Sequence, residues 1–132
     1  MKEYVSFAIA KQLNSTGFNE PCCTSYDSDG EFDSGRIEDY NTKYDSIISA
    51  PSMLQVAEWL RQKGIFIDVI TIYDENPDEI RQFLPHPQYY FKVRIYYYKK
   101  WEELPMTYLE WDDALMTGIQ ASLNYLNGIG AG

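Results

Sequence analysis

The feature that most constrains the fold is an amphipathic helix joined directly to a β-strand between Ser52 and Tyr73. Ser52 followed by Gln55 is a capping box, and apolar residues then recur at helical spacing up to Leu60. Gly64 favours the left-handed conformation that ends a helix, and the run from there to Tyr73 is rich in β-branched residues. This segment therefore predicts a helix that packs on a sheet.

A second strand is predicted at Tyr89–Tyr98, where the side chains alternate between two faces. Phe91, Val93 and Ile95 share one face, and polar or aromatic residues occupy the other. This alternation is typical of an antiparallel strand with one face in the core. Its best partner is the strand Ile65–Tyr73.

Two more amphipathic helices are predicted, at Ser6–Gln12 and Trp111–Leu126, in addition to Met53–Lys63. A polar turn divides the segment Cys22–Phe32, which predicts a hairpin that extends the sheet or lies beside it. Together these elements predict an α+β fold, a small antiparallel sheet packed on one face by about three helices. The predicted core consists of Phe7, Ile9, Leu13, Val56, Leu60, Ile67, Val69, Phe91, Val93, Ile95, Leu115, Ile119 and Leu123.

The remaining segments are less regular. We expect residues 34–50 to form an ordered surface loop that holds a short strand around Arg36–Asp39. Asn76, followed by Pro77, should begin a short helix that ends at Phe83 or Leu84. No linker divides the chain, so we expect one domain over residues 1–132, with 127–132 as a flexible tail.

Composition limits the class of protein. Over 132 residues, 45% hydrophobic and 23% charged side chains are typical of a globular domain. The formal net charge of −9 opposes extended binding to nucleic-acid phosphates. Because no apolar run approaches the ~20 residues that span a bilayer, and no signal peptide is recognisable, we expect a cytoplasmic protein with no membrane partner.

Few residues are candidates for chemistry. The turn Asp27–Gly30 resembles part of a calcium loop, but Arg36 stands where such a loop needs its closing glutamate. Cys22 and Cys23 are adjacent, which is unsuitable for gripping one tetrahedral ion, and His86 is the sole histidine. We therefore predict no catalytic, cofactor-binding or metal-binding residue, although proximity of a cysteine to the histidine stays open.

Carboxylates cluster at residues 74–79, 102–103 and 110–113. The first and third clusters lie at predicted helix starts, where the helix dipole stabilises negative charge. A metal-dependent hydrolase would require such carboxylates to converge on a bound ion. It is the least favoured alternative.

The outward face of the second strand is the most informative surface, because aromatic and basic side chains alternate on it. Such a face can stack nucleic-acid bases, pair with a neighbouring strand or bind a protein. Tyrosine and arginine are enriched at protein-binding hot spots, and the acidic net charge disfavours nucleic acid. We therefore expect the partner to be a protein or a second copy of this chain. The predicted interaction surface consists of Tyr90, Arg94, Tyr96, Tyr98 and Trp101.

Three stretches carry a resemblance to other proteins: Val5–Lys11, Gly17–Cys22 and Ser49–Arg61. They are similar to a group of small uncharacterised proteins from gut Bacteroidetes genomes and the phages and prophages that these genomes carry. The resemblance extends into Ile67–Val69 and recurs weakly in the final helix. It implies a cytoplasmic protein of mobile-element origin and brings no established activity, substrate or site residue.

These observations favour a non-catalytic, protein-binding accessory protein of phage or prophage origin. A rival hypothesis makes the acidic surface the active element, which would inhibit a basic nucleic-acid-binding enzyme by mimicking nucleic acid. It requires the acidic side chains to lie along one ridge at phosphate-like spacing.

Overall fold

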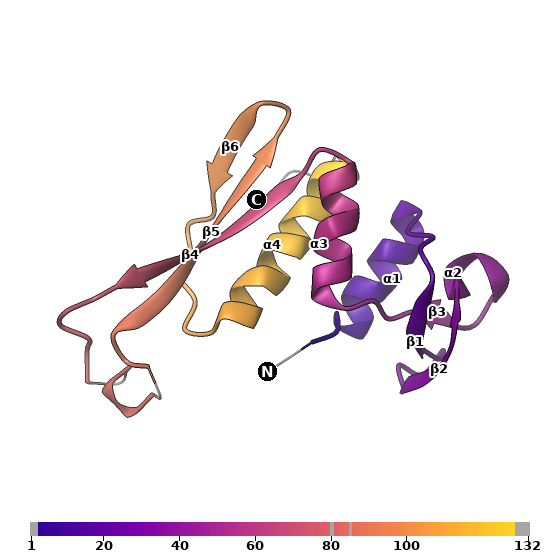
Figure 1. The fold of residues 1–132 in the computed structure, drawn as a ribbon, viewed down its shortest axis with the longest axis horizontal. Coiled ribbons are helices and arrows are strands. Elements are labelled where there is room, and N and C mark those ends of the chain that lie inside the picture. The colour runs from indigo at the N-terminus through magenta and orange to yellow at the C-terminus, as the bar shows by residue number, and fades with distance from the viewer. Residues whose placement is uncertain (1–2, 80, 85, 129–132) are drawn as a thin grey trace.

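The computed structural model describes residues 3–79, 81–84 and 86–128. Within these ranges the chain has an α+β fold with four α-helices and two three-stranded antiparallel sheets (Figure 1). The elements in chain order are α1 (Phe7–Thr16), β1 (Cys22–Tyr26), β2 (Phe32–Glu38), α2 (Tyr40–Lys43), β3 (Ile48–Ser49), α3 (Met53–Gln62), β4 (Phe66–Tyr73), the 3₁₀ turn η1 (Arg81–Phe83), β5 (Tyr89–Tyr97), β6 (Lys100–Glu103) and α4 (Trp111–Leu126).

The predicted α+β class is confirmed, but the strands form two sheets. The first sheet has the order β2-β1-β3 and the second β4-β5-β6. Helices α1, α3 and α4 lie between the two sheets, which occupy opposite ends of the molecule (Figure 1). The predicted Cys22–Phe32 hairpin therefore cannot extend the second sheet, and it recruits the short strand β3 instead.

Local capping explains where α1 and α3 begin and end. The Ser6 Oγ accepts the N–H of Ile9 at 3.2 Å, and the Ser52 Oγ accepts the N–H of Gln55 at 3.1 Å. Gly64 has φ +82, as predicted for the residue that stops α3 before β4. The reciprocal half of the capping box is absent among the described hydrogen bonds, because the Gln55 amide donates to the carbonyl of Pro21.

The second sheet is built on the predicted pair of long strands. β4 and β5 pair antiparallel over the whole of β4, with Ile67 opposite Ile95 and Val69 opposite Val93. These side chains face α4, where Gly118 approaches the sheet closely. Strand β6, which the sequence analysis did not predict, completes the sheet beside β5.

A cluster of buried apolar residues joins the three long helices to the second sheet and to Cys22 of β1. Most of the predicted core is buried in it. Four predicted core residues are only half-buried, namely Phe7, Ile67, Val69 and Phe91. The last three pack at the edge of the cluster, and Phe7 packs on Tyr26 with ring centroids 5.4 Å apart.

Several predictions for the connections were wrong. The strand expected around Arg36–Asp39 is the end of the longer strand β2, but residues 34–50 also contain the short helix α2 and β3, which the loop prediction missed. The helix expected from Asn76 is only the turn η1, and Asp78 caps it by accepting the N–H of Arg81 at 2.8 Å. Of the predicted tail, residues 129–132 lie outside the described residues, and α4 ends at Leu126 as expected. None of the described helices combines the length and apolar character needed to cross a membrane.

Candidate functional site

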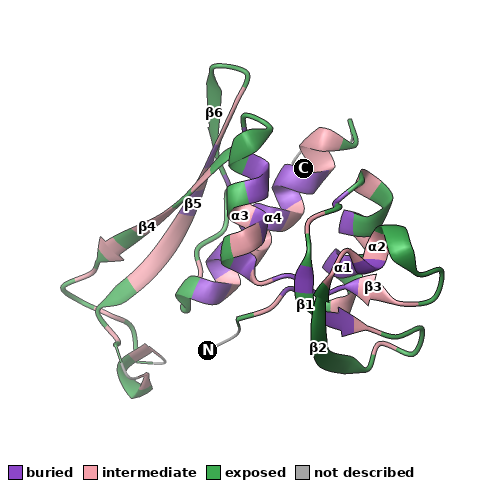
Figure 2. Ribbon diagram, turned by 45° about the vertical axis from the view of Figure 1, so that its right-hand side comes forward, coloured by how far each residue is buried: buried purple, intermediate pink, exposed green. Residues whose placement is uncertain are grey.

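The face of the second sheet that points away from α4 is covered by none of the described helices (Figure 2). Strand pairing and the alternation of side chains place every second residue of β4 and β5 on this surface, together with two residues of β6. We call it the open face. It consists of Phe66, Asp68, Ile70, Ile72, Tyr90, Lys92, Arg94, Tyr96, Trp101 and Glu103.

The open face brings together four of the five predicted interaction residues. Tyr90, Arg94 and Tyr96 lie on β5, and Trp101 lies directly opposite Tyr96 on β6. The three β5 side chains are half-buried among their neighbours, and Trp101 is 58% exposed. No neighbouring strand was predicted beyond β5, so the sequence analysis selected Trp101 without knowing its position.

Tyr98 is the exception. It and Lys99 form the two-residue turn between β5 and β6, and both have positive φ, +54 and +64. The left-handed backbone takes Tyr98 out of the strand alternation, and its ring packs on Tyr97, with centroids 4.4 Å apart. Tyr97 faces α4, where it contacts the ring of Tyr125, so Tyr98 lies outside the open face.

Arg94 is the centre of the open face. The register places it between Asp68 on β4 and Glu103 on β6. Its guanidinium carbon lies 5.1 Å from the centroid of the Trp101 ring, within the range of a cation–π contact. The Arg94 Nε is buried and has no hydrogen-bond partner among the described residues. The Arg94 guanidinium therefore stacks on the Trp101 ring, and its Nε–H group makes no hydrogen bond within the described part of the chain.

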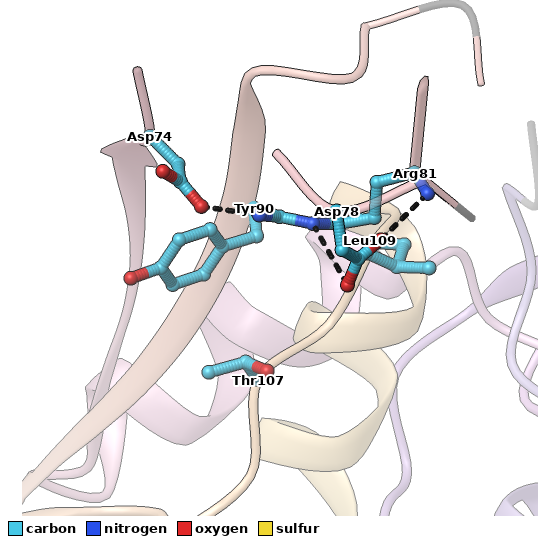
Figure 3. Close-up of a pocket in the computed structure, with 6 residues that line it drawn as sticks. All are labelled: Asp74, Asp78, Arg81, Tyr90, Thr107 and Leu109. Carbon is cyan, nitrogen blue, oxygen red and sulfur yellow. Dashed lines mark hydrogen bonds and ion pairs between the residues drawn. The ribbon is translucent and has the colours of Figure 1, made fainter. Parts of the chain in front are cut away.

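A pocket of about 580 Å³ lies at the end of the sheet where Tyr90 begins the open face (Figure 3). Arg81 donates to the carboxylate of Asp74, and its Nε lies 3.8 Å from an Asp78 oxygen. Its guanidinium carbon is 5.4 Å from the Tyr90 ring centroid. The lining residues are Asp74, Asp78, Arg81, Tyr90, Thr107 and Leu109.

Arg81 determines what this pocket can do chemically. Its hydrogen bond holds the pKa of Asp74 below the ordinary value, so that carboxylate stays ionised. A general acid needs a raised pKa, which Asp74 lacks. The pocket is therefore better suited to holding a polar group than to proton transfer. Asp78 was expected in the first turn of a short helix, and neither Asp74 nor Arg81 was predicted to form a site. The sequence feature that could have indicated this ion-paired cluster is a single arginine that follows four acidic residues within a short segment.

The cysteines and the histidine are not arranged for nucleophilic catalysis. Cys22 is buried and Cys23 exposed, because neighbouring side chains on a strand point to opposite faces. Burial raises the pKa of the Cys22 thiol to about 11, so it is protonated at neutral pH and unreactive. His86 is exposed in the connection between β4 and β5, which lies at the other end of the molecule from β1 (Figure 1).

Glu110, Asp112 and Asp113 form an acidic group whose carboxylate oxygens lie within 4.8 Å of one another. They stand at the start of α4, where the helix dipole stabilises negative charge as the sequence analysis argued. Asp112 is nevertheless buried, and its carboxylate accepts the N–H of Asp113 at 3.2 Å. Its burial was not predicted, since the spacing of α4 gave no reason to direct an aspartate inward.

The turn Asp27–Gly30 is a hairpin turn, as predicted. The carboxylate of Asp27 accepts the N–H groups of Asp29 at 2.8 Å and Glu31 at 3.0 Å, and the Gly30 N–H bonds to the Asp27 carbonyl. The Asp27 carboxylate oxygen therefore accepts two backbone hydrogen bonds that stabilise the turn.

The fold and the open face together define an α+β protein with a sheet surface that is rich in aromatic side chains and carries equal numbers of basic and acidic ones. Comparison of the chain with protein-family models, with curated proteins and with solved structures found no significant match.

Proposed function

We propose that this chain is a non-catalytic accessory protein, of phage or prophage origin, that binds another protein through the open face. The observation that carries the proposal is an aromatic and arginine-containing sheet face that none of the described α-helices covers (Figure 2). The few hot-spot residues that dominate binding at protein interfaces are enriched in tyrosine, tryptophan and arginine.

The charge of the open face favours a protein over a nucleic acid. The face carries two basic side chains, Lys92 and Arg94, and two acidic ones, Asp68 and Glu103. It is therefore formally neutral, although the chain as a whole carries −9. A neutral aromatic surface suits a partner that offers mainly apolar groups and few charged ones.

Site-specific photo-crosslinking in host cells tests this proposal. A photoreactive phenylalanine analogue at Tyr96 is expected to give a discrete product with one protein. The same analogue at Ile37, an exposed residue of β2, is the matched control and is expected not to give that product. Adding Arg94→Ala and Trp101→Ala should reduce the Tyr96 product about tenfold or more, because each removes a hot-spot side chain.

Identical products from both positions, or no product from Tyr96, would contradict the proposal. The acidic-mimic alternative predicts a different pattern. Binding would then be insensitive to these two substitutions and would weaken steeply as salt is raised, because exposed charges are screened.

A further inference from the structure

Strand β4 is an edge of the second sheet. Among the described residues it pairs only with β5, and the Asp74 N–H bonds to the Gln88 carbonyl at 2.7 Å just beyond the strand. Hydrogen bonding alternates along an antiparallel pair, so the even-numbered residues of β4 bond to β5. The odd-numbered ones direct their backbone groups outward. These outward residues are Ile67, Val69, Thr71 and Tyr73, and no hydrogen bond of the described residues outside the β4–β5 pair reaches their backbone groups.

Edge strands are normally protected against pairing with other chains by charge, proline, bulges or short length. The other edges of this molecule follow the rule. Strand β6 spans only Lys100–Glu103 and has three charged residues, and β2 carries three charges, a glycine and an irregular register.

β4 lacks these protections. It has eight residues in unbroken register, and its only charged side chain is Asp68. Five of its residues are β-branched, which favours a regular extended strand. In Figure 1 the end of β4 and the start of β5 extend beyond the helices, and Thr71 and Tyr73 on this part of β4 are exposed. This edge is unlike the others in the same chain.

The sequence of β4 allows it to pair with itself. Two copies related by a two-fold axis pair antiparallel, and the outward residues must face one another for hydrogen bonds to form. When the axis passes at Ile70, Val69 lies opposite Thr71 of the second copy, and Ile67 lies opposite Tyr73. All four outward residues then lie in hydrogen-bonded pairs across the interface.

Charge selects the same register. With the axis at Ile70, each Asp68 lies opposite Ile72 of the second copy. An axis at Asp68 would oppose the two aspartates directly, and an axis at Thr71 would place Asp68 opposite Asp74. An axis at Val69 avoids these clashes but leaves Tyr73 without a partner inside the strand.

We propose that two copies of this chain pair antiparallel through the free edges of β4, about a two-fold axis at Ile70, to form one continuous six-stranded sheet. Both α4 helices then lie on one side of the sheet, and the two open faces join on the other. The proposal does not rest on the function proposed above, because it concerns pairing through the backbone edge of β4, which sedimentation of the isolated chain measures without any partner.

Sedimentation equilibrium of the wild-type chain and two lysine variants tests the pairing. The wild type is expected to be a dimer. Ile70→Lys places two cations opposite each other at the axis and should raise the dissociation constant about tenfold or more. Ile72→Lys is the matched control on the same strand and face. It places its cation opposite Asp68 of the second copy and should leave the dimer as stable or more stable.

Disulfide trapping tests the register independently of how well the lysine variants fold. In a Cys23→Ser background, Ile70→Cys brings two thiols to a non-hydrogen-bonded pair, whose Cα atoms lie about 4.5 Å apart, within disulfide range. Mild oxidation should give a covalent dimer, and Ile72→Cys should give far less. A wild-type chain that sediments as a monomer would overturn the proposal, as would equal trapping at the two positions.

Discussion

At the residue scale, the turn at Tyr98 and Lys99 has the greatest influence on the predicted site. Two consecutive residues with positive φ are typical of the type I′ turns that close tight hairpins, where Asn-Gly is the preferred pair. A side chain in this conformation costs about 1–2 kcal/mol relative to a right-handed one. The pairing of β6 with β5, which places Trp101 opposite Tyr96, offsets this cost.

Replacing the turn by Tyr98→Asn and Lys99→Gly should therefore stabilise the protein, by about 1 kcal/mol, because both new residues tolerate positive φ. Urea unfolding followed by circular dichroism measures the change. Tyr98→Phe is the control and should have little effect, since it retains the strained backbone. The double variant should also keep the crosslink from Tyr96, because Tyr98 lies outside the open face. A less stable double variant would show that the turn is not strained.

Tyr125 predicts a pH dependence of stability at the other face of the same sheet. Burial and the hydrogen bond that its hydroxyl donates to Glu102 raise the pKa of Tyr125 to about 12. The ordinary pKa in an unfolded chain is about 10, so the contribution of Tyr125 is fully present below pH 10. It is lost as the pH rises from about 10 to about 12, where the unfolded chain ionises first.

The comparison that isolates this effect is wild type against Tyr125→Phe. Between about pH 9 and about pH 11.5, the free energy of unfolding should fall more for the wild type than for the variant, as measured by urea titration at each pH. Other tyrosines with raised pKa values, such as Tyr26 and Tyr40, are present in both proteins and cancel. Parallel pH profiles would contradict the assignment.

At the scale of elements, the packing of α4 on the second sheet depends on Gly118. A Cβ built at Gly118 would lie 2.6 Å from the Ile67 Cγ2 and 3.1 Å from the Val93 Cγ1. The helix and the sheet approach each other closely only because that side chain is missing. In the sequence, a glycine inside a helix indicates only a weaker helix, so its packing role was not predicted.

Gly118→Ala should accordingly destabilise the protein by about 1 kcal/mol. Overpacking costs about 1–3 kcal/mol, which exceeds the gain of about 1 kcal/mol in helix propensity. In an Ile67→Ala background the same substitution should become neutral or stabilising, because the clashing methyl group is gone. Thermal or urea unfolding of the four proteins completes the cycle, and equal effects in the two backgrounds would be inconsistent with a steric origin.

At the scale of the whole molecule, the candidate interfaces themselves carry little of the acidic charge. The chain carries −9, the open face is formally neutral, and β4 has one charged residue. Acidic residues such as Asp74 and Asp78 adjoin these interfaces, so pairing and binding should be tighter in moderate salt than at low ionic strength. Pairing at β4 would place the two open faces side by side and allow bivalent binding of a symmetric or repetitive partner.

The sequence by itself determined the local elements of this protein. Caps at Ser6 and Ser52, the stop at Gly64 and the alternation along Tyr89–Tyr97 depend on neighbours a few residues away, so periodicity and capping chemistry predict them. The α+β class followed from these elements. Most of the predicted interaction residues lie on one face for the same reason, because alternation fixes the face of a strand residue.

Only the tertiary structure decided how the elements combine. The separation of the strands into two sheets, the addition of β6, the burial of Asp112 and the pocket around Arg81 depend on contacts between distant segments. Tyr98 lies outside the predicted surface because its backbone has a positive φ. This conformation is disfavoured for tyrosine, and the pairing of β5 with β6 stabilises it. Local propensities are worth about 1 kcal/mol or less per residue, and packing a sheet on a helix layer outweighs them.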